Sequence, residues 1–147
     1  VTTYDGRAFL NVVDRQYDVI MVDAYQDITI PFQMSSVEFF TLVKEHLKED
    51  GVMVVNMNMR GSREGNINQY LADTIATVFG QVYTVDVSGS TNRELFASDN
   101  PAMTDNLAAA LGKLPQGSLA DLMGRVSQGL EAYAAGSHVM TDDKAPT

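Results

Sequence analysis

The residue best placed for chemistry is Asp23, which closes an apolar run that begins after Asp18. The run, residues 19–22, is short and rich in β-branched side chains, which predicts a strand buried on both faces, as in a parallel sheet. In open α/β sheets, ligands bind where strands end and the following loops begin. Asp23 is therefore a functional candidate. Position alone supports equally well a solvated aspartate at the end of a strand.

The composition excludes several other kinds of site. The chain has 147 residues, 45% of them apolar, which suits one globular domain. It has no Cys and only His46 and His138, so we expect neither a thiol nucleophile nor a zinc site, and we interpret both histidines as surface residues. The net charge of −9 disfavours nucleic acid and is compatible with a cationic ligand.

The sequence contains no apolar stretch long enough to span a membrane and no recognisable targeting segment. We therefore expect no membrane contact by this segment, and a cytoplasmic location.

The predicted elements of the first half alternate between strands and helices. Residues 1–4 look like the end of a strand, and residues 7–13 predict a short helix. After the strand that ends at Asp23, Ser35 and Glu38 stand at capping-box spacing and predict the start of a helix.

Further along, Gly51 is predicted to stop that helix as the left-handed residue beyond its C-cap. Residues 52–56 predict a second buried strand, and residues 57–65 a polar loop. Asn66 is predicted to cap a helix over residues 67–79.

The second half predicts an antiparallel hairpin followed by two helices. The hairpin has strands at 82–87 and 93–98 joined by the turn 88–92. The helices cover residues 104–111 and a longer stretch from Ser118 through Tyr133, closed by Gly136. This order indicates an α/β fold, the carboxyl-terminal part of a Rossmann-like sheet with flanking helices.

Six pieces of sequence together match one enzyme family. They are DGRAFL at 5–10, YDVIMVDAY at 17–25, IPF at 30–32, EFF at 38–40, GVMVVN at 51–56 and TDDKAP at 141–146. With these pieces the chain resembles the spermidine synthases, or polyamine aminopropyltransferases. The resemblance implies a partial Rossmann-like sheet of the class I methyltransferase type, mainly parallel, with a C-terminal antiparallel hairpin.

The resemblance implies roles for particular residues. Asp5 and Gly6 would bind the nucleoside, with Asp5 accepting a hydrogen bond from the adenine amino group. Asp23 would lie beside the reacting centre and take or orient the proton of the attacking amine. The chemistry needs a base and positioning but no acid, because the sulfonium leaves as a neutral thioether.

Tyr25, Gln26 and Asp27 would contact the amine substrate. The family usually has a second aspartate where this chain has Gln26, which accepts a hydrogen bond but brings no charge. Asp27 could replace it if the loop shifts by one residue, and Tyr25 could line the alkyl chain.

The family's glycine-rich turn and ribose-binding acidic residue would both lie before Val1. We therefore expect residues 1–147 to form a single domain, the C-terminal part of a catalytic domain without its N-terminal cofactor-binding strands. Such a fragment is expected to be inactive alone and to bind no cofactor tightly. Its exposed strand edge favours self-association, in the simplest case as a homodimer.

The leading hypothesis is a domain of an aminopropyltransferase, which moves an aminopropyl group from decarboxylated S-adenosylmethionine to an amine such as putrescine. One alternative is an S-adenosylmethionine-dependent methyltransferase of the same fold with another acceptor. Gln26 favours this alternative, because it replaces the aspartate that usually holds an amine of the substrate. The other is a non-catalytic structural or ligand-sensing module.

Overall fold

The structure is a computed structural model that describes residues 5–23, 30–57 and 65–144. Its centre is a sheet with the strand order β1-β2-β4-β3-β5, in which β1 and β2 are parallel and the other neighbours antiparallel. The strands are β1 (Tyr17–Val22), β2 (Leu47–Met57), β3 (Gln81–Asp86), β4 (Arg93–Ser98) and β5 (Glu131–Ala132). The predicted hairpin is thus confirmed as β3 and β4. The expectation of a mainly parallel sheet is wrong for the described strands, because the hairpin inserts β4 beside β2 and leaves β1–β2 as their one parallel pair.

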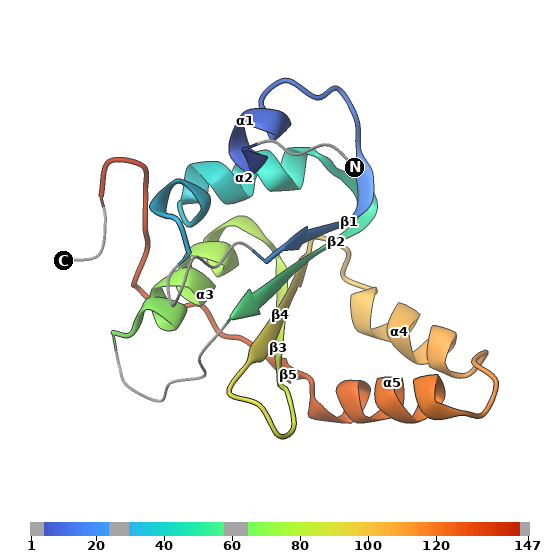
Figure 1. Ribbon diagram of the computed structural model, residues 1–147. Helices are drawn as coiled ribbons and strands as arrows, with labels where there is room; N and C mark the ends of the chain where they lie inside the picture. The colour runs from blue at the N-terminus through green and yellow to red at the C-terminus, as the bar shows by residue number, and fades with distance from the viewer. Residues whose placement is uncertain (1–4, 24–29, 58–64, 145–147) are drawn as a thin grey trace.

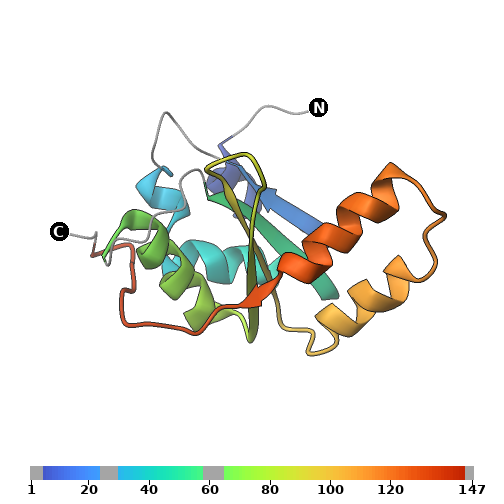
Figure 2. The same cartoon turned by 90° about the horizontal axis from the view of Figure 1, so that it is seen from below.

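Helices lie on both sides of this sheet (Figures 1 and 2). They are α1 (Gly6–Leu10), α2 (Val37–Glu45), α3 (Ile67–Val78), α4 (Met103–Leu111) and α5 (Ser118–Gly129), with a 3-10 turn at Phe32–Met34. The predicted cap of α3 is confirmed, because the Asn66 side chain accepts a hydrogen bond of 2.9 Å from the Gln69 amide.

The main hydrophobic core lies between one face of the sheet, here called the core face, and helices α2 and α3. Alternate strand residues point to it, as the period of a strand requires. Its fully buried side chains include Phe40, Val43, Met53, Val55, Leu71, Ile75 and Leu95.

The opposite face, here called the second face, is only partly covered. Helices α4 and α5 lie over Val52 and Phe96 and line with them an open apolar pocket of about 390 Å³. At the outer strand β1, Val19 and Met21 are 53% and 72% exposed. The prediction that this strand is buried on both faces is therefore wrong for the described chain, since helices cover its core face alone.

Two predictions at the ends of α2 are also wrong. The N-cap is Ser36, whose hydroxyl oxygen accepts from the Phe39 amide at 3.3 Å, because Ser35 closes the preceding 3-10 turn and bonds the Phe32 carbonyl. Gly51 is no helix stop, since it lies inside β2 after a bulge in the pairing with β1. An added Cβ there would lie 2.9 Å from the Lys48 carbonyl oxygen, so the close backbone approach requires glycine.

The last helix is shorter than predicted. Helix α5 ends at Gly129, and the chain continues in extended form through β5, where the Tyr133 amide bonds the Val82 carbonyl at 2.9 Å. The helical period of residues 118–133 does not extend the helix past Gly129, because residues 131–132 pair with β3 and the Tyr133 hydroxyl makes a part-buried hydrogen bond.

The acceptor of that hydrogen bond is Asp73, a carboxylate of α3 whose side chain is 1% exposed. Its oxygens accept from the Tyr133 hydroxyl (2.7 Å), the Gly136 amide (2.9 Å) and the His138 amide (3.0 Å), and His138 Nδ1 lies 3.1 Å away. Burial alone would raise the pKa of Asp73, but these hydrogen bonds outweigh it and the pKa is lowered.

Neither histidine is a plain surface residue, so that interpretation is wrong. His138 contacts Asp73 and packs its ring 4.7 Å from the Tyr70 ring. His46 ends α2, and its ring nitrogens lie 2.8 Å and 3.0 Å from the carbonyl oxygens of Leu42 and Val13.

The uncovered strand β1 predicts that this 147-residue chain self-associates through that edge. Met21→Asp should raise the dissociation constant of the dimer about tenfold or more, because an unpaired charge is costly to bury. Val12→Asp is the matched control, since Val12 is 75% exposed and lies outside β1. Sedimentation velocity would contradict the prediction if the parent chain were a monomer or if both variants dissociated equally.

Candidate functional site

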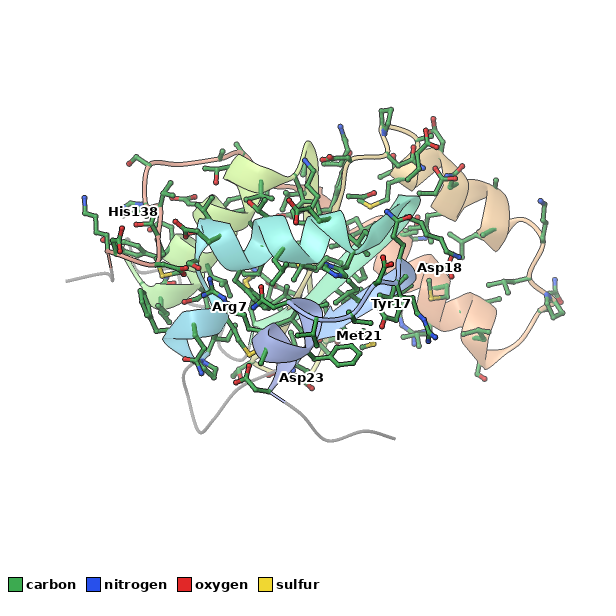
Figure 3. The ribbon with its side chains drawn as sticks, turned by 90° about the horizontal axis from the view of Figure 1, so that it is seen from above. Arg7, Tyr17, Asp18, Met21, Asp23 and His138 are labelled. Atoms are coloured by element: carbon green, nitrogen blue, oxygen red, sulfur yellow. The ribbon has the colours of Figure 1, made fainter. Side chains whose placement is uncertain are left out.

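The candidate site is built by three neighbouring strands at one end of the second face. The β1–β2 register aligns Val22 with Val55, so Asp23 follows beside Asn56, and the Asn56 amide Nδ2 donates to Asp23 Oδ1 at 3.3 Å. On the other side of β2, Asn56 is paired with Glu94 of β4. Figure 3 shows Asp23 at the end of β1 nearest α1, with Tyr17 and Asp18 at the opposite end.

The cluster of Asp23, Asn56 and Glu94 presents mainly hydrogen-bond acceptors, two of them carboxylates. Burial raises the pKa of Glu94, and the negative charge of Asp23 raises it further. Neither carboxylate takes part in an ion pair within the described ranges. The Asn56 amide oxygen is buried and has no hydrogen-bond partner in that part of the chain. The arrangement is therefore suited to a ligand that donates protons or carries positive charge.

Asp5, the predicted nucleoside contact, is exposed and is the N-cap of α1. Its Oδ1 accepts from the Ala8 amide at 2.8 Å, while Oδ2 has no hydrogen bond among the described residues. Gly6 begins the helix and, with Val22, lines a largely apolar hollow of about 270 Å³ beside β1. Asp5 and Asp23 do not line that hollow, but each is the sequence neighbour of a residue that does, Gly6 and Val22 respectively.

The other predicted contacts, Tyr25, Gln26 and Asp27, lie outside the described residues. Two site residues were missed by sequence reasoning. Asn56 closes an apolar run, as Asp23 does, and this signal could have revealed it. Glu94 had no such signal, because only the pairing of β4 with β2 brings it to Asn56.

Other kinds of site find no support in the ranges 5–23, 30–57 and 65–144. They contain no group of three or more His, Asp or Glu side chains placed to hold a metal ion. Among the helices of the same ranges, none has the length and apolar character needed to cross a bilayer.

A family model describing the spermine/spermidine synthase domain matches residues 1–89, which is more than half of the chain. The chain belongs to the spermine/spermidine synthase family. A curated protein of this kind, a probable polyamine aminopropyl transferase from Bifidobacterium longum, is 68% identical over 99 residues. Those residues are 66% of this chain and 22% of that relative, so the chain spans a minor part of the relative's length.

Solved structures confirm the predicted fold class. A probable spermidine synthase from Corynebacterium glutamicum has a TM-score of 0.53 at 19% identity, covering 95% of this chain and 55% of its own. A spermidine synthase in complex with the transition-state analogue AdoDATO has a TM-score of 0.54 at 20% identity, over 77% and 38%. Human methyltransferase-like protein 13, in complex with SAH, has a TM-score of 0.58 at 20% identity, over 86% and 55%. The fold of this chain is therefore similar both to that of spermidine synthases and to that of a methyltransferase-like protein.

In this family member a salt bridge holds the C-terminal segment against α1. The carboxylate of Asp142 accepts from Arg7 Nη1 and Nη2 at 2.8 Å and 2.5 Å and from the Ser36 hydroxyl at 2.5 Å. The Asp142 amide donates to Glu38 at 3.0 Å. Asp5 caps α1 and Gly6 begins it. The Arg7–Asp142 salt bridge therefore holds in place the helix that carries the predicted nucleoside contacts. The hydrogen bonds from Arg7 and Ser36 lower the pKa of Asp142 to about 2.

This pKa predicts how the stability of the fold depends on pH. A carboxylate whose pKa is lowered by folding stabilises the fold above its unfolded pKa of about 3.8, and this contribution is lost as pH falls toward 2. Asp142→Asn should cost about 1 kcal/mol near neutral pH, a modest value because the side chain is 38% exposed. The cost should shrink as pH falls through about 2, where Asp142 becomes protonated in the folded protein.

Chemical denaturation of both proteins between pH 2 and pH 7 measures this difference. Asp143→Asn is the control, since the neighbouring Asp143 makes no hydrogen bond or ion pair among the described residues. A cost of Asp142→Asn that stays constant from pH 7 to pH 2 would show that the lost interaction is not that of the ionised carboxylate.

Proposed function

We propose that the full-length protein transfers an aminopropyl group from decarboxylated S-adenosylmethionine to a small amine such as putrescine. The observation that carries the proposal is Asp23, a carboxylate at a strand end, bonded to Asn56 and paired with no cation in the described part of the chain. The family supports it. So does the name of the relative from Bifidobacterium longum, although the match spans 22% of that protein.

The proposed step needs a base that is close to the amine. The nitrogen of the amine, once it has lost a proton, attacks the propyl carbon bound to the sulfonium sulfur. A C–N bond forms, the C–S bond breaks, and its electron pair stays on sulfur as a neutral thioether. Asp23 takes the proton that the nitrogen gives up, and the Asn56 amide holds the Asp23 carboxylate in place.

The sulfonium nucleoside is a substrate of this reaction and supplies the activated propyl carbon. Asp5 and Gly6 are proposed to bind its nucleoside part, with the unbonded Oδ2 of Asp5 accepting from the adenine amino group. Tyr25, Gln26 and Asp27 are proposed amine contacts on the strength of the family resemblance alone. We further propose that residues 1–147 contribute the C-terminal part of the catalytic domain and bind no nucleoside tightly by themselves.

The test of the function is turnover by the full-length protein with decarboxylated S-adenosylmethionine and putrescine, followed by detection of the aminopropylated product. Asp23→Asn should lower kcat about a hundredfold or more, the usual scale for a positioned base. Affinity for methylthioadenosine should change little. Asp18→Asn, at the other end of β1, is the matched control.

Near-normal turnover by Asp23→Asn would remove this residue from the mechanism. Transfer of a methyl group from S-adenosylmethionine, without aminopropyl transfer, would favour the methyltransferase alternative.

A second prediction separates two roles of Asp5. Asp5→Asn keeps a capping oxygen for the Ala8 amide but replaces the second acceptor with a donor, because Asn caps helices as well as Asp does. If Asp5 accepts from adenine, this variant should bind methylthioadenosine about tenfold to a hundredfold more weakly, since an unpaired polar group is left in the pocket. Calorimetry on the full-length protein measures the affinity.

Asp5→Ala provides the comparison, because it removes both the cap and the acceptor. Weak binding by Asp5→Ala together with normal binding by Asp5→Asn would show that Asp5 acts only as the cap of α1.

A further inference from the structure

Residues 133–142, here called the strap, follow β5 and run past helices α3, α2 and α1 in turn. The strap contains neither a helix nor a strand, so its position depends on the bonds that it makes with other elements. Figure 1 shows the chain leaving β5 and passing α3 on its way to the C-terminus.

The anchor of the strap is the carboxylate of Asp73 on α3. This side chain is 1% exposed and accepts from the Tyr133 hydroxyl and from the amides of Gly136 and His138. A buried carboxylate is costly to leave without donors, so these bonds hold the strap on α3. The backbone passes so close at Gly136 that an added Cβ would collide with the Asp73 oxygens.

Beyond the anchor, further hydrogen bonds set the course of the strap. The Met140 amide donates to the Thr74 hydroxyl at 3.0 Å, and the Met140 carbonyl accepts from the Val37 amide at 2.9 Å. The amides of His138, Met140 and Asp142 thus all donate to side chains of α3 or α2. Asp142 is therefore placed by the same run of bonds that begins at the anchor.

The far end of the strap holds helix α1. This helix has five residues, and its one buried residue is Leu10. Within the described ranges, Arg7 is the one residue of α1 whose side chain hydrogen-bonds to another element, and its acceptors are Asp142 and the Gln33 carbonyl. So short a helix is not stable by itself, and its position depends on tertiary contacts of this kind.

We propose that the strap positions α1 for binding of the nucleoside, and that Asp73, as the anchor of the strap, is a positioning residue for this site. The inference rests on the proposed function, in which Asp5 and Gly6 contact the nucleoside. Asp73 acts from α3 through Asp142 and Arg7 and does not itself touch the ligand.

A link of this kind works in both directions, because two coupled sites share one coupling free energy. Binding of methylthioadenosine should therefore slow hydrogen exchange at the amides of His138 and Met140, which bond to side chains of α3. Amides of β4 serve as the reference, since no hydrogen bond joins β4 to the strap in the described part of the chain. A strap that only stabilised the fold would not respond more than β4.

The principal variant is Gly136→Ala, which places the colliding Cβ at the anchor and leaves α1 unchanged. Calorimetry on the full-length protein should show methylthioadenosine binding about fivefold or more weaker, the usual scale of coupling between sites. Gly124→Ala in α5 is the matched control, because an added Cβ there would meet no atom within 4 Å. Where turnover is measured, the KM for decarboxylated S-adenosylmethionine should rise and kcat should change little, since the strap does not reach the reacting atoms.

The double variant Gly136→Ala with Asp142→Asn tests the route from anchor to helix. If both changes act through the bond between Asp142 and Arg7, the double variant should bind the nucleoside no more weakly than the more affected single variant. Additive losses would overturn this route. Unchanged affinity in Gly136→Ala would overturn the role of the strap.

Tyr133→Phe takes the place of Gly136→Ala if that variant fails to fold. It removes one donor from Asp73 and keeps the ring, so it should weaken nucleoside binding in the same direction by a smaller factor. Unchanged affinity in Tyr133→Phe would then overturn the inference.

The binding readout keeps this inference separate from the proposed reaction. A protein whose nucleoside affinity depends on the strap but that transfers no aminopropyl group would refute the reaction and support the strap. Aminopropyl transfer with an unchanged KM for the nucleoside substrate in both Gly136→Ala and Asp142→Asn would refute the strap and support the reaction.

Discussion

The register in which β1, β2 and β4 pair is the constraint on which the candidate site depends. The alignment of Val22 with Val55 places Asp23 beside Asn56, and the antiparallel pairing of β2 with β4 places Glu94 on the other side. A slip of one residue would turn each of these side chains to the core face. The bulge that ends at Gly51 lets β2 keep this register after the turn from α2, because only glycine allows the close approach of the Lys48 backbone.

A second constraint comes from the buried carboxylate of Asp73. Its donors all belong to residues 133–138, so it fixes the path of the chain after β5. That path continues to Met140, whose amide bonds the Thr74 hydroxyl and whose carbonyl accepts from the Val37 amide. Two residues later Asp142 reaches Arg7 of α1. The C-terminal segment therefore connects α3, α2 and α1 in order, and Figure 1 shows it passing α3 toward the end of the chain.

Patterns in short stretches of sequence correctly predicted the elements that are set by interactions between residues close in sequence. The β3–β4 hairpin and the Asn66 cap of α3 follow from alternation, turn residues and cap chemistry, and the structure confirms them. The errors arise where tertiary contacts compete with a local signal. Serine is a favourable N-cap residue, but the Ser35 hydroxyl donates to the Phe32 carbonyl of the preceding 3-10 turn and does not cap α2.

The last helix shows the same competition. The sequence has a helical period through Tyr133, but residues 131–132 pair with β3 and Tyr133 bonds Asp73, so the helix ends earlier. For the site, the strand-end signal found Asp23. Glu94 could not be found in this way, because its proximity to Asn56 depends on which strands are neighbours.

The most direct measurement of the account is a crystal structure of the full-length protein with methylthioadenosine and putrescine. We predict one amine nitrogen within hydrogen-bonding distance of the Asp23 carboxylate and the adenine amino group within hydrogen-bonding distance of Asp5. A diamine bound with both of its nitrogens away from Asp23 would contradict the proposed function.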